Sequence, residues 1–206
     1  TLEWVWALHL GRKVALYCSD VSGAFDRVEE ERLLEKLWQK GVRGKLLEVL
    51  RSWLQTSTAY VVVEGAFSTA VDLKNMVFQG TVLGPPLWNV FFADAKEAVN
   101  FAGFQDASFA DDLNCWKTFP GNEPNSLLLD AAKESQQEVH RWGAGNRVLF
   151  DAGKESVHVL SHRQPEGSNF KVLGVQWDTK LLMHDAAETL VREARWKVQQ
   201  LLRARR

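Results

Sequence analysis

The chain has 206 residues, of which 46% are hydrophobic and 25% charged, a composition typical of a folded globular domain rather than a disordered chain or a coiled coil. Its two cysteines, Cys18 and Cys115, form no CxxC pair, which argues against a disulfide framework or a zinc module. The formal net charge of −1 provides no overall attraction to nucleic acid, because phosphate binding needs clustered Lys and Arg.

The apolar segments favour an intracellular protein of the nucleus or cytoplasm. The longest strongly apolar stretch, Val82 to Ala95, contains two prolines and is shorter than the ~20 residues that a membrane span needs. The N-terminus shows no charged leader followed by an apolar core, so we expect neither a secretory signal nor a transmembrane segment. Because the first residue is Thr1 rather than Met, we expect a piece of a longer protein.

The N-terminal part of the chain predicts one strand followed by two helices. Residues 13–20 form a short apolar run of strand-forming residues that ends in a carboxylate, so they predict a buried strand with Asp20 at its end. Residues 29–41 and 44–55 carry leucines at helical spacing, and Gly41 marks the end of the first helix.

The middle of the chain predicts two hairpins on either side of a helix. Residues 57–75 alternate like two strands around a turn at Glu64 and Gly65. Pro85 and Pro86 mark the first turn of the helix, where backbone N–H groups have no partner. Residues 103–117 predict the second hairpin, and its turn carries two adjacent acids.

The C-terminal part predicts a helix over residues 125–142, strands over 148–160 and 169–178, and a last helix from about Asp185. Strands and helices in this irregular order, with two hairpins, indicate an α+β fold rather than a doubly wound parallel sheet. Residues 191–206 carry six basic side chains and one acid, which fits either a solvated helix face or a surface that follows a nucleic-acid backbone.

Three carboxylates are the candidate functional groups: Asp20 at a strand end, and Asp111 with Asp112 at the hairpin turn. Adjacent acids repel each other and are costly to desolvate without a cation. Oxygen ligands without a nearby His or Cys favour Mg²⁺ or Mn²⁺, and two such ions ~3.5–4 Å apart can promote phosphoryl transfer. The spacing alone is also explained by the preference of turns for Asp. His158 and His162 lie too far apart on a strand end to bind zinc together.

Five segments in order resemble the successive palm motifs of reverse transcriptases, most closely those of non-long-terminal-repeat retrotransposons. The resemblance spans about Val14 to Asp178, and the joint occurrence of the motifs is far more specific than any one of them. The segments are SDVSGAFD (Ser19 to Asp26), FQGTVLGP (Phe78 to Pro85), FADD (Phe109 to Asp112), Lys154 in DAGKES, and FKVLGV (Phe170 to Val175).

The resemblance implies a role for each matching residue. Asp20 and Asp111 would bridge two Mg²⁺ ions, Asp112 would be a weaker or outer ligand, and the Val21 carbonyl would add an oxygen. Lys154 would protonate the departing pyrophosphate. The remaining matches are the nucleotide-binding residues Phe25, which would exclude a 2′-hydroxyl, and Gln79 and Gly80, and the primer grip at Leu173 and Gly174.

The implied fold is a polymerase palm, an antiparallel sheet with helices packed on one face. We expect residues 1–12 to be a remnant of the preceding fingers or of a connector helix, 13–180 to be the palm, and 181–206 to begin the thumb or form a basic C-terminal helix. We therefore expect the fingers to be largely absent from this sequence and the thumb to be truncated.

The implied function is RNA-directed DNA polymerase of a retroelement, with an RNA template, a DNA primer and deoxynucleoside triphosphates as partners. Two alternatives stay open on the sequence: an inactive copy that binds nucleic acid or protein, and a metal-dependent phosphodiesterase using the same carboxylates. The sequence does not indicate an oligomeric state.

Overall fold

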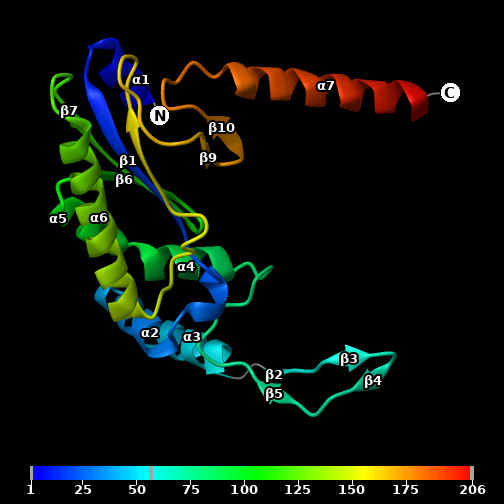
Figure 1. Cartoon of the computed structure of the whole chain (residues 1–206). Helices are drawn as coiled ribbons and strands as arrows, with labels where there is room; N and C mark the ends of the chain where they lie inside the picture. The colour runs from blue at the N-terminus through cyan, green and yellow to red at the C-terminus, as the bar shows by residue number, and fades with distance from the viewer. Residues whose placement is uncertain (1, 56–57, 205–206) are drawn as a thin grey trace.

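The computed structural model describes residues 2–55 and 58–204 as one α+β molecule (Figure 1). The helices are α1 (Leu2–His9), the 3₁₀ helix η1 (Ala24–Arg27), α2 (Glu30–Gln39), α3 (Lys45–Gln55), α4 (Gly84–Phe92), α5 (Ala95–Phe101), α6 (Asn125–Asn146) and α7 (His184–Ala204). The strands are β1 (Lys13–Asp20), β2 (Thr58–Ala59), β3 (Val62–Val63), β4 (Ala66–Phe67), β5 (Val71–Asp72), β6 (Gln105–Phe109), β7 (Asp112–Phe119), β8 (Ser156–Leu160), β9 (Phe170–Val172) and β10 (Val175–Trp177).

The central sheet has the strand order β6-β7-β1-β8, and each neighbouring pair is antiparallel. β1 lies between β7 and β8, so its backbone hydrogen bonds are made on both sides. Its side chains are buried on both faces: Ala15 and Tyr17 belong to one core cluster, and Leu16 and Cys18 to the other. Burial on both faces explains why this strand is a continuous apolar run instead of an alternating one.

One face of the sheet is covered by helices, as expected for a palm. α6 packs against β1 and β8, and α5 packs against β6 and α6 (Figure 1). An aromatic cluster joins α4 to α6, because Trp88 stacks on Phe92 at 5.1 Å and Trp142 meets the edge of Phe92 at 5.2 Å. The helical layer therefore has a continuous core with the sheet.

The opposite face is covered by α1 and by the separate two-stranded sheet of β9 and β10. Trp4 of α1 lies at the centre of this second core, with its ring centroid 5.8 Å from that of Trp116 and 6.3 Å from that of Phe170. The sequence indicated a remnant of the fingers or a connector helix within residues 1–12 but not its contact with the sheet, so this cover is an addition to the predicted layer of helices.

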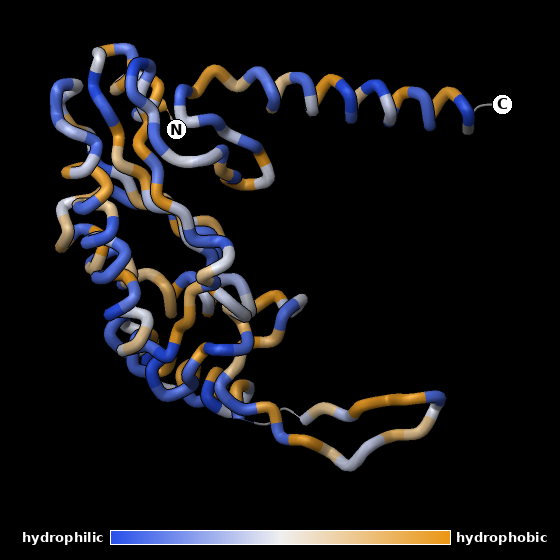
Figure 2. The backbone as a smooth tube through the Cα atoms, in the orientation of Figure 1, coloured by the Kyte–Doolittle hydropathy of each residue, from blue (hydrophilic) through white to orange (hydrophobic). Residues whose placement is uncertain are grey.

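Two segments extend from the body of the molecule (Figure 1). The first is the ribbon formed by β2–β5, which turns at Glu64 and Gly65 as predicted and is hydrophobic along much of its length (Figure 2). The second is α7. Within residues 2–55 and 58–204, no helix combines the length and hydrophobicity that crossing a membrane requires.

Several predicted boundaries differ from the structure. The helix expected over 125–142 continues to Asn146, where Arg147 adopts a left-handed conformation with φ 58°. Only Ser156–Leu160 of the strand expected over 148–160 is a strand, because hydrogen-bonded turns occupy the residues before it. Asp94 lies between α4 and α5, where it accepts a hydrogen bond from Lys36 at 2.8 Å.

Candidate active site

The ends of β1 and β7 bring two of the predicted carboxylates together. Asp20 is the last residue of β1, and it is paired in register with Asp112, the first residue of β7. The backbone N–H of Val21 donates to the Asp111 carbonyl at 3.1 Å, which fixes the hairpin turn beside the end of β1. Residues 92 positions apart in the sequence are thus held on adjacent strands by the sheet ladder.

The β6–β7 turn consists of Ala110 and Asp111, while Asp112 already belongs to β7. Ala110 adopts a left-handed conformation with φ 54°, which is uncommon for a residue with a side chain. Trp88 in α4 donates from Nε1 to the Ala110 carbonyl at 2.6 Å, so a buried indole holds this strained turn in place. The turn that carries the acids is therefore anchored to the helical layer.

Lys154 reaches the carboxylate of Asp20 across the end of the sheet. Its Nζ lies 2.6 Å from Asp20 Oδ2, and this hydrogen bond raises the pKa of the Lys154 ammonium. The turn that carries Lys154 is tied to the same strand end, because the Asp151 N–H donates to the Asp20 carbonyl at 2.9 Å. The lysine is thus held beside the carboxylate by backbone as well as side-chain contacts.

The carboxylates of this site repel one another. Partial burial raises the pKa of Asp112, and the neighbouring charges of Asp111 and Asp20 raise it further, whereas Lys154 acts in the opposite direction. The single ammonium does not cancel this repulsion. A cation placed between these carboxylates would be stabilised by all of them.

A cleft of about 460 Å³ opens over this strand end. The β9–β10 turn forms part of its wall, with Leu173 at φ 50° and Gly174 at φ 81°. Two separate sheets therefore line one cavity. Its lining residues are Cys18, Ser19, Asp20, Asp112, Asn114, Lys154, Ser156, Lys171, Leu173 and Gly174.

The predicted nucleotide-binding residues lie outside this lining. Phe25 is half-buried against Trp88, with ring centroids 6.0 Å apart. Its carbonyl accepts from the Val77 N–H at 2.8 Å, which attaches the loop that carries Gln79 and Gly80. Those two residues are exposed, and Gly80 has φ 84°. The structure thus links Phe25 to the loop but does not bring either into the cleft with Asp20.

The oxygen atoms at this cleft suit a hard divalent cation, since Asp20 and Asp112 both provide carboxylates there. A bound cation would also relieve the repulsion between these two carboxylates. Across residues 2–55 and 58–204, no group of three or more His, Cys, Asp or Glu side chains is positioned to hold a metal ion. Lys154 occupies Asp20 Oδ2 in this conformation. Metal binding by all three aspartates stays a prediction.

Sequence reasoning missed two features of the site. Lys171 lines the cleft, although only Leu173 and Gly174 were selected from the same short segment; its positive charge was the available signal. Glu155, next to Lys154, accepts hydrogen bonds from Tyr17 and from His140, the latter at 2.6 Å. No local pattern indicates the contact between Tyr17 and Glu155, since these residues are 138 positions apart.

An antiparallel sheet that places carboxylates at the ends of two adjacent strands, with helices behind it, is the palm of a nucleic-acid polymerase. A family model described as "Reverse transcriptase (RNA-dependent DNA polymerase)" matches residues 7–177. The chain belongs to this family. Reverse transcriptases generally use divalent metal ions and bind RNA templates.

Curated relatives are retroelement proteins of Drosophila. The "RNA-directed DNA polymerase from mobile element jockey" of Drosophila melanogaster is 39% identical over 177 residues, which cover 82% of this chain and 18% of that protein. The "Probable RNA-directed DNA polymerase from transposon X-element" of the same species is 28% identical over 181 residues, covering 80% of this chain and 20% of that protein. The chain thus spans about a fifth of the length of these relatives.

Solved structures with the same fold include telomerases. Apo telomerase from Candida tropicalis, truncated from its C-terminal domain, has a TM-score of 0.63 and 15% identity over 88% of this chain and 38% of that chain. Telomerase from Candida albicans, in complex with a fragment of telomeric RNA, has a TM-score of 0.60 and 14% identity, covering 82% of this chain and 30% of that chain. At these identities the likeness concerns the fold alone.

Proposed function

We propose that this chain is the palm of an RNA-directed DNA polymerase that transfers nucleotides from deoxynucleoside triphosphates to a primer 3′ end on an RNA template. The observation that carries the proposal is the position of Asp20, in register with Asp112, bound by Lys154, and lining the same cleft as Leu173 and Gly174. Two carboxylates that can hold cations, an ammonium and a second sheet meet at one cavity, which suits a polyanionic substrate bound through metal ions.

The acidic residues would hold two Mg²⁺ or Mn²⁺ ions. Asp20 and Asp111 would bridge them, Asp112 would be the outer ligand, and the Val21 carbonyl would supply a further oxygen. When bound, the ions would neutralise charge that develops on the reacting phosphate. For this to happen Lys154 would release Asp20 Oδ2, and its side chain, which is 62% exposed and lines the same cleft, would have room to do so.

The remaining residues would position the substrates. Lys154 would carry a proton at Nζ and donate it to the departing pyrophosphate. Phe25 would lie beneath the sugar and exclude a 2′-hydroxyl, while Gln79 and Gly80 would lie against the incoming nucleotide. Leu173 and Gly174 would hold the primer end in line for attack. Because no covalent intermediate is required, positioning and charge neutralisation would supply most of the rate.

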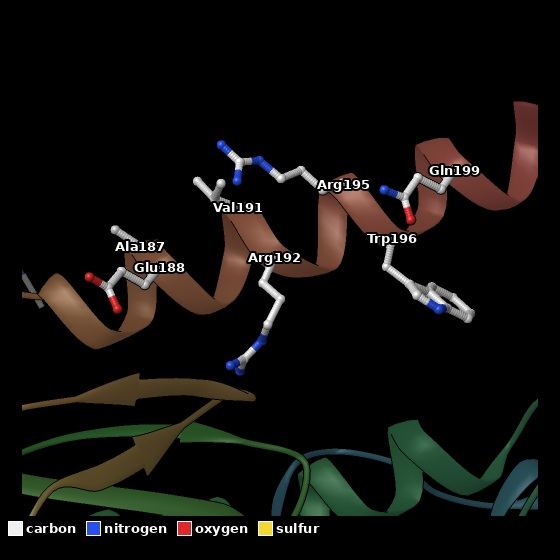
Figure 3. A pocket seen from close by; sticks show the side chains of 7 residues that line it. All are labelled: Ala187, Glu188, Val191, Arg192, Arg195, Trp196 and Gln199. Atoms are coloured by element: carbon white, nitrogen blue, oxygen red, sulfur yellow. The ribbon is translucent and has the colours of Figure 1, made fainter.

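The proposed division of the chain places the palm at residues 13–180. Residues 1–12 would belong to the fingers or a connector helix, and 181–206 would begin the thumb or form a basic C-terminal helix. Figure 3 shows Arg192 and Trp196 on one side of α7 and Arg195 on the other. A basic and aromatic face of this kind suits a helix that lies along the backbone of a primer–template duplex.

Primer extension on an RNA template with Mg²⁺ and deoxynucleotides tests this function. Asp111→Asn is expected to lower the extension rate by at least about a hundredfold, since it removes a carboxylate that would hold the metal ions. Asp130→Asn, the same change at an exposed position of α6, is the control and should leave the rate unchanged. Equal rates for the two variants would remove Asp111 from the proposed role.

Manganese binding followed by electron paramagnetic resonance gives a second measurement that does not depend on turnover. The native chain should bind Mn²⁺ and Asp20→Asn should not. Binding without extension would favour the inactive copy, and release of nucleotides from single strands without added deoxynucleotides would favour the phosphodiesterase. An absence of Mn²⁺ binding in the native chain would overturn the proposal.

A further inference from the structure

A second cavity lies at the end of the central sheet opposite Asp20. It has a volume of about 540 Å³ and is formed by three connections: the one between α1 and β1, the one between β7 and α6, and the one after β8 (Figure 1). Seven residues along β1 separate Lys13 from Asp20, so the two ends are about 23 Å apart. Its lining residues are Leu8, His9, Gly11, Arg12, Gly121, Asn122, Ser161, His162 and Arg163.

The charged groups of this lining are all basic. Arg12 and Arg163 carry permanent positive charge, and His9 and His162 add two ring nitrogens each, while no Asp or Glu belongs to the lining. Among the residues that the structure describes, neither arginine has a carboxylate within 4.0 Å. In a chain with a formal net charge of −1, two unpaired guanidinium groups at one cavity are a local excess of positive charge.

The buried ammonium of Lys13, at the start of β1 beneath the same connections, adds to this local excess of positive charge. Lys13 is only 3% exposed, and its Nζ donates to the Glu123 carbonyl at 2.8 Å, Asn125 Oδ1 at 2.9 Å and Gln164 Oε1 at 2.8 Å. All three acceptors are neutral, so the charge of Lys13 is hydrogen-bonded but not cancelled. The carboxylates of Glu123 and Glu166 lie on these connections but outside the cavity lining.

The cavity is also fixed in shape. A Cβ at Gly121 would lie 2.0 Å from the Gly11 carbonyl oxygen, so only glycine allows the first and second connections to meet. Lys13 joins the second connection to the third. The Ser161 hydroxyl accepts from the Arg163 N–H at 3.3 Å, which orders the turn that carries His162 and Arg163. The basic side chains therefore project from anchored backbone.

We propose that this cavity binds phosphate groups of a polynucleotide strand, at a site separate from the cleft at Asp20. Guanidinium groups recognise phosphate through paired N–H donors, and anchored backbone reduces the entropy lost on binding. The basic groups come from two separate parts of the chain, His9 and Arg12 around the end of α1 and His162 with Arg163 after β8, which suits successive phosphates of one strand better than a single small anion. That the site binds phosphate follows from its basic groups alone. That the phosphate belongs to a polynucleotide rests on the proposed polymerase function.

Binding of a fluorescent 20-nucleotide RNA, followed by anisotropy without metal or deoxynucleotides, tests the proposal. The double variant Arg12→Ala/Arg163→Ala should weaken binding by at least about tenfold. The slope of log K against log salt should fall by about 1.4, since each single-strand phosphate contact accounts for about 0.7. Arg12→Lys/Arg163→Lys keeps both charges and should retain most of the slope.

Lys40→Ala/Lys133→Ala is the matched control, because it removes two exposed positive charges from α6 and the end of α2, away from the three connections. If its affinity and slope equal those of the arginine double variant, the cavity is not a phosphate site. Melting curves by circular dichroism should show the same fold for all variants, because each substituted side chain is exposed.

Calorimetry with inorganic phosphate separates the two sources of the ligand. If the arginine variant loses phosphate binding but keeps its affinity for RNA, the site takes a small anion and the polynucleotide assignment is wrong. The RNA titration uses neither metal nor deoxynucleotides, and Asp130→Asn on α6 should match the native chain in it, so a failure of the polymerase proposal leaves this measurement interpretable.

Discussion

Tyr17 of β1 donates a hydrogen bond from its hydroxyl to the carboxylate of Glu155, the residue that follows Lys154. Tyr17 is fully buried, and His140 of α6 contacts the same carboxylate oxygen at 2.6 Å. The strand that ends in Asp20, the turn that carries Lys154 and the longest helix of the described chain are therefore joined at one carboxylate.

Tyr17→Phe should destabilise the protein by about 1–3 kcal/mol, because it leaves the Glu155 carboxylate without one of its donors. Urea denaturation measures the free energy of unfolding. Tyr60→Phe is the control, since Tyr60 is 55% exposed on the ribbon and its substitution should change stability by less than about 0.5 kcal/mol. Equal changes for both variants would mean that the Tyr17 hydroxyl contributes nothing to the fold.

Asp112→Asn should stabilise the fold at pH 7 by up to about 1 kcal/mol, because it removes a carboxylate that repels Asp111 and Asp20. Burial and these charges raise the pKa of Asp112, so its ionised form opposes folding above that raised pKa. The gain in the free energy of unfolding should therefore disappear below the pKa of this carboxyl in the unfolded chain, where it is protonated in both the folded and the unfolded state. Unfolding measured at pH 7 and pH 3.5 checks this; a gain that is the same at both values would contradict it.

Acidification should destabilise the protein through His158. Burial of this β8 side chain against Phe170 of β9 lowers the pKa of its imidazole to about 4, against about 6.5 when unfolded. The neutral ring is favoured in the fold, so its contribution is complete above pH 6.5 and is lost as the pH falls toward 4. The expected loss is about 3 kcal/mol.

His158→Leu removes this titration and should flatten stability against pH between 6.5 and 4.5, whatever its effect at neutral pH. His162→Leu is the control, because His162 is an exposed histidine four residues along the chain. If the native chain and His158→Leu lose stability equally over this interval, other groups cause the acid sensitivity.

Phe25→Val should admit ribonucleotides if Phe25 acts as the proposed gate. The smaller side chain leaves room for a 2′-hydroxyl, so the ratio of deoxynucleotide to ribonucleotide kcat/KM should fall by about 10- to 100-fold. Phe101→Val, an exposed aromatic at the end of α5, should leave the ratio unchanged. A constant ratio in Phe25→Val would assign that ring to packing against Trp88 alone.

The strongest sequence predictions are those that depend on local pattern. The buried strand that ends at Asp20 was predicted with its bounds unchanged, because its apolar run is short and ends at a carboxylate. The 103–117 hairpin and the ribbon turn at Glu64 and Gly65 were also confirmed, since turn residues divide each pair of strands. Family membership followed from the order of the motifs.

Contacts between distant residues could not be predicted. Nothing near Lys154 in the sequence indicates that its ammonium meets Asp20, 134 positions earlier. The cover formed by α1 was missed because its apolar residues are distributed around much of the helix, so no single face marks it as amphipathic. Asp112 was assigned to the turn, but β7 begins one residue earlier than the acidic pair suggests.

The two walls of the cleft at Asp20 belong to different sheets. Asp20 and Asp112 sit on strands of the four-stranded sheet, whereas Leu173 and Gly174 form the tip of the isolated β9–β10 pair. The tip can therefore shift relative to the acids without breaking any inter-strand hydrogen bond of the larger sheet. In the proposed polymerase, this arrangement would allow the primer grip at Leu173 and Gly174 to move along a bound strand while the carboxylates stay in place.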